Sequence, residues 1–186
     1  MVTAKSDERR KAILRASIDL VSEHGAEWLT MARIGEATGL SRSAIYQYFE
    51  SKDHVLGELL IDDMADLSNE IDRIVASVND PMEQIRIWIH YSLAHLASAD
   101  HLVVREISMT HLREEQRGEL MAMHGFFLTT LHSPLIQLGV SDPTSLGSMI
   151  FGAVNSAAQR IYSGKSFIHE AATLEKFVIA GIEAAI

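Results

Sequence analysis

The stretch that decides the fold is residues 29–56, LTMARIGEATGLSRSAIYQYFESKDHVL. Its pattern predicts two short helices separated by a glycine turn. Thr30 is a good cap for a first helix over residues 31–38, and Gly39 supplies the turn. The serine after the turn can cap a second helix over residues 42–48. The stretch therefore predicts a helix-turn-helix.

The start of the second predicted helix carries residues that suit contact with DNA. Ile45 and Phe49 lie four residues apart, which turns one face inward and leaves the N-terminal end outward. A recognition helix presents its first residues to base edges in the major groove. Arg42 can pair two donors with guanine, while tyrosine and lysine side chains can reach phosphate oxygens. The predicted DNA-contacting residues are Thr30, Arg33, Arg42, Ser43, Ala44, Tyr46, Tyr48 and Lys52.

The run over residues 45–52, IYQYFESK, with Val55 and Leu56, resembles the end of the DNA-binding domain in TetR-type (TetR/AcrR) transcriptional repressors. Further residues upstream fit the same pattern: Ile13, Leu14, Ala16, Leu20, Gly25, Thr30, Ile34, Gly39, Leu40 and Ser41. The similarity covers roughly the first third of the chain. Gly35 departs from the usual alanine, which a tight helix contact would tolerate. Ser43 departs from a common glycine, so we expect it to influence base reading.

The composition indicates a globular, largely helical chain. It has 186 residues, of which 47% are hydrophobic and three are proline, enough for a proper core. The absence of cysteine excludes disulfides and thiol redox sensing. No run approaches the roughly 20 apolar residues that span a bilayer, and the N-terminus is polar. We therefore expect a soluble cytoplasmic protein without membrane contact.

The net charge of -9 is unexpected for a DNA-binding protein, but the acid is unevenly placed. Residues 1–56 hold eight basic and eight acidic residues, whereas residues 57–186 hold eight basic and seventeen acidic ones. The excess acid thus lies outside the helix-turn-helix. DNA affinity would depend on a locally basic face. Its predicted members are Lys5, Arg9, Arg10, Lys11, Arg42 and Lys52.

Periodic apolar residues and breakers predict helices over most of the remaining chain. The predicted ranges are 6–24, 52–77, 81–98, 100–109, 112–132, 142–163 and 169–186. Together with the resemblance, they imply an all-α fold. We expect a three-helix helix-turn-helix DNA-binding domain at residues 1–56. A larger helical domain for ligand binding and dimerisation would follow at residues 57–186.

The second faces of the middle helices mix broad apolar surfaces with a few polar tips, which suits a small-molecule pocket between helices. The predicted effector-binding residues are Trp88, Tyr91, His95, His111, Met121, His124 and Phe127. For each residue alone, ordinary core packing is the alternative. The nine histidines form neither HxxxH nor HExxH, so no metal or cofactor is expected.

Small residues in the last third would let another backbone approach closely. The predicted dimer interface comprises Leu146, Ile150, Ala153, Ala157, Ile161, Phe177, Val178 and Ile182. Two such helices from each subunit can close a four-helix interface, as in the family that the chain resembles. The alternative is a final hairpin that packs only on its own chain.

The resemblance implies a homodimeric repressor that binds a palindromic double-stranded DNA operator and is released by a small-molecule effector. Enzyme motifs such as GxSxG, a P-loop or a strand-flanked GxGxxG are absent from the sequence, so no catalytic residues are predicted. Two alternatives stay open. One is an activator or corepressor-dependent regulator of the same fold. The other is a small-molecule-binding helical protein or enzyme that does not act on DNA.

Overall fold

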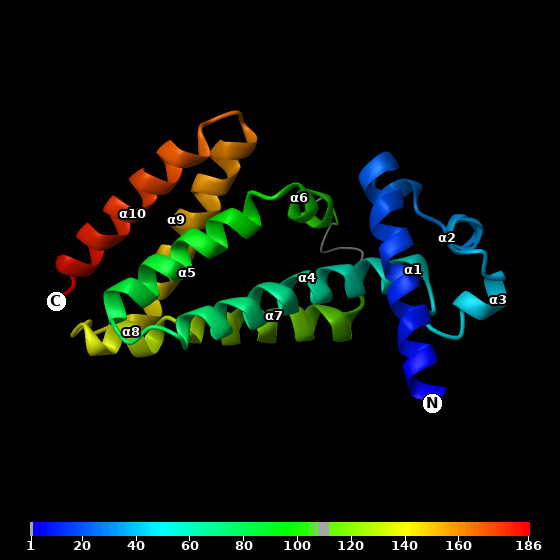
Figure 1. Ribbon diagram of the computed structural model, residues 1–186, viewed down its shortest axis with the longest axis horizontal. Coiled ribbons are helices and arrows are strands. Elements are labelled where there is room, and N and C mark those ends of the chain that lie inside the picture. The colour runs from blue at the N-terminus through cyan, green and yellow to red at the C-terminus, as the bar shows by residue number, and fades with distance from the viewer. Residues whose placement is uncertain (1, 106, 108–111) are drawn as a thin grey trace. The chain divides into compact units, whose positions relative to one another are not determined.

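A computed structural model describes residues 2–105, 107 and 112–186, and every regular element among them is helical (Figure 1). The prediction of an all-α fold is confirmed. The chain divides into two compact units. Unit 1 comprises Met1–Asp63 and Leu102–Met121, and unit 2 comprises Met64–His101 and Ala122–Ile186. Unit 1 thus extends beyond the boundary predicted after residue 56 and includes a segment that is distant in sequence.

Unit 1 contains the predicted helix-turn-helix as α2 and α3. Its elements are α1 (Val2–His24), η1 (Ala26–Trp28), α2 (Met31–Thr38), α3 (Arg42–Ile45), the first half of α4 (Lys52–Val75), the end of α6 (Ala99–Arg105) and the start of α7 (Glu114–Thr129). The regular part of α3 ends three residues before the predicted end, and turns continue the chain to Tyr48.

The local chemistry predicted for the helix-turn-helix is present. The Thr30 hydroxyl accepts a hydrogen bond from the Arg33 amide at 3.3 Å, and the Ser41 hydroxyl accepts one from the Ala44 amide at 3.2 Å. The Thr30 cap satisfies a donor at the start of α2, and the Ala44 amide donates both to the Ser41 hydroxyl and to the Ser41 carbonyl oxygen, at 2.9 Å. Between them, Gly39 adopts a left-handed conformation with φ of 68°. These caps and the turn fix where α2 ends and α3 begins.

Gly35, which departs from the family pattern, lies at a close approach of two backbone segments. A β-carbon at this buried position would lie 2.9 Å from the backbone oxygen of Leu40. A backbone oxygen cannot swing aside as the end of a side chain can. The glycine therefore lets the turn pack directly against α2, as expected for a tight helix contact.

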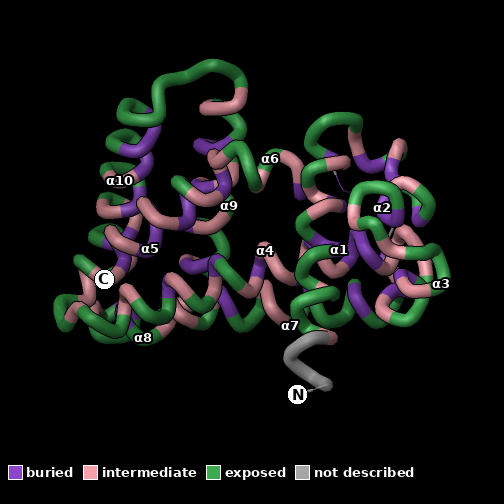
Figure 2. The backbone as a smooth tube through the Cα atoms, turned by 45° about the vertical axis from the view of Figure 1, so that its right-hand side comes forward, coloured by how far each residue is buried: buried purple, intermediate pink, exposed green. Residues whose placement is uncertain are grey.

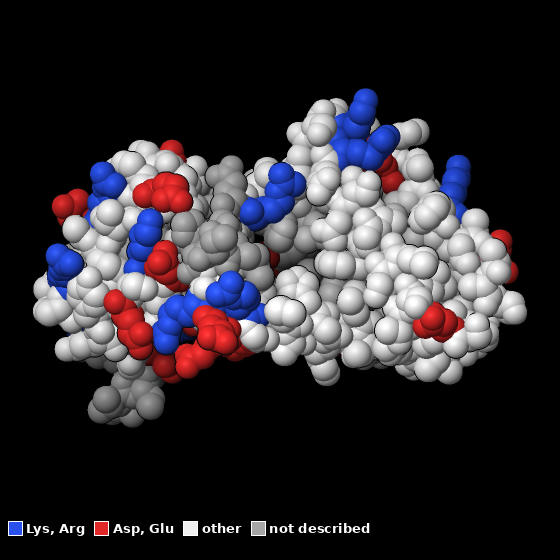
Figure 3. Space-filling view, turned by 180° about the vertical axis from the view of Figure 1, so that it is seen from behind, with Lys and Arg blue, Asp and Glu red and all other residues white. Residues whose placement is uncertain are grey.

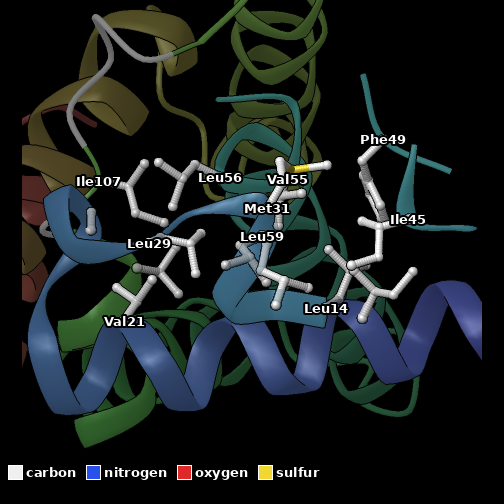
Figure 4. Packing of buried hydrophobic residues seen from close by; sticks show 14 residues of the cluster. Leu14, Val21, Leu29, Met31, Ile45, Phe49, Val55, Leu56, Leu59 and Ile107 are labelled. Carbon is white, nitrogen blue, oxygen red and sulfur yellow. The ribbon is translucent and has the colours of Figure 1, made fainter. Parts of the chain in front are cut away.

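The core of unit 1 is a cluster of apolar side chains from α1, the helix-turn-helix and α4, whose members point toward one another in Figure 4. Ile45 and Phe49 are almost fully buried, which confirms the predicted inward face of the second helix. Val104 and Ile107 join the same cluster. Burying each such side chain contributes about 1.5–3 kcal/mol, so the distant segment is an integral part of unit 1.

Unit 2 contains the second half of α4 and the end of α7, together with α5 (Pro81–Leu96), α8 (His132–Gln137), α9 (Pro143–Tyr162) and α10 (Phe167–Glu183). α5 packs against α8, α9 and α10, and Figure 2 shows buried positions on one side of α10 and exposed positions on the other. No helix of the described residues is both long and apolar enough for a membrane span.

The breakers predicted for the later helices are placed as expected. Pro81 and Pro143 open α5 and α9, each behind an aspartate whose carboxylate caps the helix. α7 ends at Thr129, and Pro134 stands in the first turn of α8, where no backbone donor is required. The end predicted for α6 near Met109 lies outside the described residues.

Candidate nucleic-acid interface

Unit 1 carries a shallow surface groove between the start of α2, α3 and the start of α4. Its volume is about 350 Å³. The groove is lined by Thr30, Met31, Ala32, Arg42, Tyr46, Glu50, Ser51 and Lys52. Four of the eight predicted DNA-contacting residues are therefore brought together at one place, although they are up to 22 positions apart in sequence.

Two helix N-termini open onto this groove. The cap and first turn of α2 supply Thr30, Met31 and Ala32, and α4 begins beside Ser51, whose hydroxyl accepts a hydrogen bond from the amide of His54 at 3.1 Å. The first amides of a helix lack intrahelical acceptors and carry the positive end of its dipole. Such an arrangement favours a phosphate group.

Four further residues line the groove without having been predicted from the sequence: Met31, Ala32, Glu50 and Ser51. The side chains of Met31 and Ala32 have no affinity for phosphate, so residue type gave no signal. Their position directly after a helix cap was the available signal, because backbone amides at this position are donors whatever the side chain.

Arg42 and Tyr46 form a pair on the outer face of α3. The Arg42 Nη2 donates to the Tyr46 hydroxyl at 3.2 Å, and the guanidinium carbon lies 5.4 Å from the centre of the tyrosine ring. Tyr46 is 41% exposed although it is a large aromatic residue. The pair is thus held at the surface with donors still free to reach a partner, because a guanidinium carries five N–H groups.

Lys52 is held at the edge of the groove by a weak ion pair. Its Nζ lies 3.6 Å from a carboxylate oxygen of Glu27, which is itself 82% exposed. An exposed pair of this kind contributes about 0.2–1 kcal/mol. A phosphate arriving in the groove can therefore replace Glu27 at little cost.

The other predicted DNA-contacting residues lie elsewhere. Arg33 stacks on the Trp28 ring at 3.5 Å and donates to the backbone oxygen of Trp28 at 2.5 Å, so it supports the turn before α2. Tyr48 is half-buried against the core of unit 1. Ser43 is exposed and Ala44 is half-buried, and neither lines the groove.

Only some of the cations predicted for the basic face are accessible for contact with DNA. Arg42 and Lys52 lie in the groove, and Arg9 and Lys11 are exposed on α1. Arg10 instead pairs with Glu58 and approaches Asp62 at 3.9 Å. The side chain of Lys5 lies outside the described residues. Cations on α1 are therefore divided between solvent and the carboxylates of α4.

The predicted effector-binding residues are dispersed over both units. In unit 2, Trp88 and Phe127 are fully buried with ring centres 4.8 Å apart, and the Trp88 indole donates to the Thr130 hydroxyl at 2.8 Å. His124 packs beside Phe151, His95 lies beside His101, and Tyr91 is half-buried. Met121 belongs to unit 1 and is 67% exposed. His111 lies outside the described residues.

The predicted dimer-interface residues divide into a buried and an accessible set. Ile150, Ala157, Val178 and Ile182 are buried in one chain, because they form the inner faces of α9 and α10. Leu146, Ala153 and Ile161 are half-buried. Phe177 is 64% exposed. The inner faces thus build the core of the subunit, and the outer faces remain accessible.

A set of small and apolar residues at exposed positions of α9 and α10 is here named the α9/α10 stripe. It comprises Ser145, Met149, Gly152, Ser156, Thr173, Phe177 and Ala180, which are all exposed. A β-carbon at Gly152 would meet nothing within 4 Å. Figure 3 shows that unit 2 presents a largely uncharged surface on the side drawn there, whereas charges of both signs alternate on unit 1.

The first part of the chain is similar in sequence to known bacterial regulatory proteins. The family model described as bacterial regulatory proteins, tetR family, matches residues 13–59. The nucleoid occlusion factor SlmA of Vibrio campbellii (strain ATCC BAA-1116) is 33% identical over 95 residues, which cover 50% of this chain and 48% of SlmA. The HTH-type transcriptional regulator HbdR of Aromatoleum sp. (strain CIB) is 30% identical over 113 residues, which cover 60% of this chain and 49% of HbdR. The chain spans about half the length of these relatives.

A solved structure extends the similarity of fold to nearly the whole chain. The transcriptional regulator FadR from Bacillus subtilis, in complex with stearoyl-CoA, aligns with a TM-score of 0.74 at 19% identity. The alignment covers 95% of this chain and 98% of that one. The helices of both units therefore have counterparts in a solved structure of the same fold.

Proposed function

Since the chain belongs to the tetR family of bacterial regulatory proteins, we propose that it is a DNA-binding transcriptional repressor. In this proposal it acts as a homodimer in the cytoplasm, binds a palindromic operator and is released by a small molecule. The observation that carries the proposal is the groove of unit 1, where two helix N-termini meet Arg42, Tyr46 and Lys52.

The groove would fix the protein on the DNA backbone, and α3 would read the bases. A phosphate seated between the starts of α2 and α4 would accept from their amides and from Lys52. The outer face of α3 would then enter the major groove, with Arg42 directed at a guanine and Ser43 beside it. Contacts to phosphate set register and affinity, whereas those of α3 set sequence preference.

The α9/α10 stripe would form the dimer interface. Small residues on both helices permit close approach, and Met149 and Phe177 offer the apolar area that an interface requires. A homodimer would carry two copies of α3, and we propose that they read half-sites on successive turns of one DNA face, about 34 Å apart. The operator would therefore be an inverted repeat.

Unit 2 would bind the effector near its aromatic cluster. Trp88 and Phe127 give an apolar wall, and the fully buried Ser92 hydroxyl has no hydrogen-bond partner within the described residues. An unsatisfied buried hydroxyl is costly unless a ligand or water completes it. The FadR structure contains stearoyl-CoA, so acyl-CoA thioesters are the first compounds to test. Release requires that the ligand bind the two dimer geometries unequally.

The decisive experiment selects bound duplexes from a random DNA pool with the purified protein, at moderate salt so that non-specific phosphate binding is suppressed. Recovery of one inverted repeat supports the proposal, and a reporter promoter carrying that repeat separates repression from activation. Folded, dimeric protein that recovers nothing above background contradicts autonomous operator binding. Selected sites that do not affect transcription would instead favour a role such as that of SlmA, which is named for nucleoid occlusion.

A further inference from the structure

The groove proposed to hold phosphate contains one residue that is negatively charged, like the phosphate itself. Glu50 lines it beside Arg42 and Lys52, and its side chain is 72% exposed. A carboxylate beside a bound phosphate is repelled by it. A cation paired with Glu50 would offset this charge and leave Arg42 and Lys52 for DNA.

Arg113 is that cation. Its Nη1 lies 3.1 Å from a carboxylate oxygen of Glu50, and its Nη2 lies 3.2 Å from one of Glu115. Arg113 immediately precedes α7 and is 63 positions away from Glu50 in sequence. It lies outside the segment of 47 residues, 13–59, that the family model matches.

The start of α7 is anchored on α4 by an arrangement that depends on glycine. The Gln116 side-chain amide donates to the backbone oxygen of His54 at 3.0 Å and to a carboxylate oxygen of Glu58 at 3.2 Å. It lies over Gly57, where a β-carbon would be only 2.3–2.5 Å from its end. Gln116 is 5% exposed, and Leu112 beside Arg113 is buried as well. Arg113 is therefore held in place from both sides along the chain.

We infer that Arg113 is a further member of the DNA-binding face, which acts by neutralising Glu50 at the phosphate groove. This inference rests on the proposed function of the groove. It gives the segment before α7 an effect on operator affinity. Arg113 is a positioning residue for charge, because it acts on DNA through Glu50.

The test is a double-mutant cycle with the selected operator, in which dissociation constants are measured over a range of salt concentrations. Arg113→Ala should weaken binding about threefold to tenfold, because Glu50 is left unneutralised beside phosphate. Arg113→Lys, which keeps the charge, should weaken it less. In the background of Glu50→Gln, removing Arg113 should change neither the affinity nor the salt dependence.

Arg117→Ala is the matched control, since it removes the same charge from the same segment. Arg117 donates to the backbone oxygen of Leu112 at 3.2 Å and is not among the described residues that line the groove. Unfolding midpoints equal to that of the unaltered protein show that each variant is folded.

Two results would overturn the inference. One is an Arg113→Ala variant that binds the operator as tightly as the unaltered protein. The other is an equal loss with and without Glu50, together with a salt slope smaller by about 0.9, which would mean that Arg113 contacts phosphate itself. If the unaltered protein selects no DNA, the proposed function fails and this inference fails with it. Selection by the unaltered protein with no effect of Arg113 overturns the inference alone.

Discussion

The surfaces of the two units differ in chemical character. At the proposed DNA-binding face of unit 1, charged side chains are paired with opposite charges, as Lys52 is with the exposed Glu27 and Glu50 is with the half-buried Arg113. Unit 2 contributes most of the large apolar side chains that remain exposed in the described residues: Phe126, Ile136, Met149, Phe167, Ile168, Phe177 and Ile186. On a surface that binds a polyanion, a phosphate can replace the carboxylate that is weakly paired with a cation. A surface for a second protein stays apolar.

The largest expected effect is a loss of operator affinity, which tests the proposed DNA-binding face of unit 1. Replacing Arg42 and Tyr46 together by alanine should weaken operator binding roughly a hundredfold, since good base and backbone contacts contribute about 1–3 kcal/mol each. Fluorescence anisotropy with a labelled operator measures the change. Lys176→Ala on α10 removes one exposed cation of unit 2 and should leave affinity unchanged. Unaltered binding by the double variant would remove the assignment of α3 as the reader.

The next effect is a weaker dimer, which tests the apolar surface of unit 2. Phe177→Glu should weaken the dimer about thirtyfold or more, because a central aromatic residue of an interface contributes about 2 kcal/mol or more. Sedimentation velocity over a dilution series measures the dissociation. Ile168→Glu is the control, since Ile168 is 81% exposed but lies nine residues away, about 180° around α10. Equal dissociation by both variants would contradict the α9/α10 stripe as the interface.

A smaller effect tests whether the polar contacts of unit 1 stabilise it. Gly57→Ala should lower the free energy of unfolding by about 1–2 kcal/mol, because its β-carbon displaces Gln116 from two hydrogen bonds. Chemical denaturation measures the change. Gly57→Ala should cost less in a Gln116→Ala background, where the space is free. Gly118→Ala, whose β-carbon meets nothing within 4 Å, should instead stabilise by up to about 1 kcal/mol. Equal destabilisation at both glycines would argue against a specific contact.

The smallest effect is a pH dependence within unit 2. Two hydrogen bonds from Arg160, at 2.8 and 3.0 Å, lower the pKa of the buried Glu170 carboxyl below its ordinary value of 4.5. The unfolded chain therefore binds a proton more readily than the folded one. This contribution to stability is complete above pH 4.5 and is lost as the pH falls through the lowered pKa. Glu170→Gln should flatten the acid limb of stability against pH, and an unchanged limb would show that the pair is not coupled to folding.

How far the sequence predicted the molecule also differs between the units. In unit 1, the caps Thr30 and Ser41 and the turn at Gly39 act over a few residues, so their positions in sequence determined the local structure. Arg33 and Tyr48 were predicted to contact DNA from residue type alone. The stacking partner of Arg33 and the core beneath Tyr48 depend on packing between elements, which spacing does not reveal.

In unit 2, helix positions were predictable and helix faces were not. The starts of α5 and α9 followed from proline behind a capping aspartate. Whether Val178 faces its own core or a partner depends on which neighbour covers that side of α10. Likewise, no local pattern could show that the segment holding Val104, Ile107 and Gln116 belongs to unit 1, because its partners lie about 50 or more residues earlier in the chain.

Because unit 1 is built from two separate stretches of the chain, it limits where a chimera can be joined. The chain passes from unit 1 to unit 2 after Asp63, returns at Leu102 and leaves again after Met121. A chimera joined at a single point behind the helix-turn-helix would inherit a foreign residue in place of Val104 and would separate Glu50 from Arg113. A chimera that keeps unit 1 must therefore retain residues 102–121. The part that can be exchanged is two separate pieces of chain, which have to be replaced together.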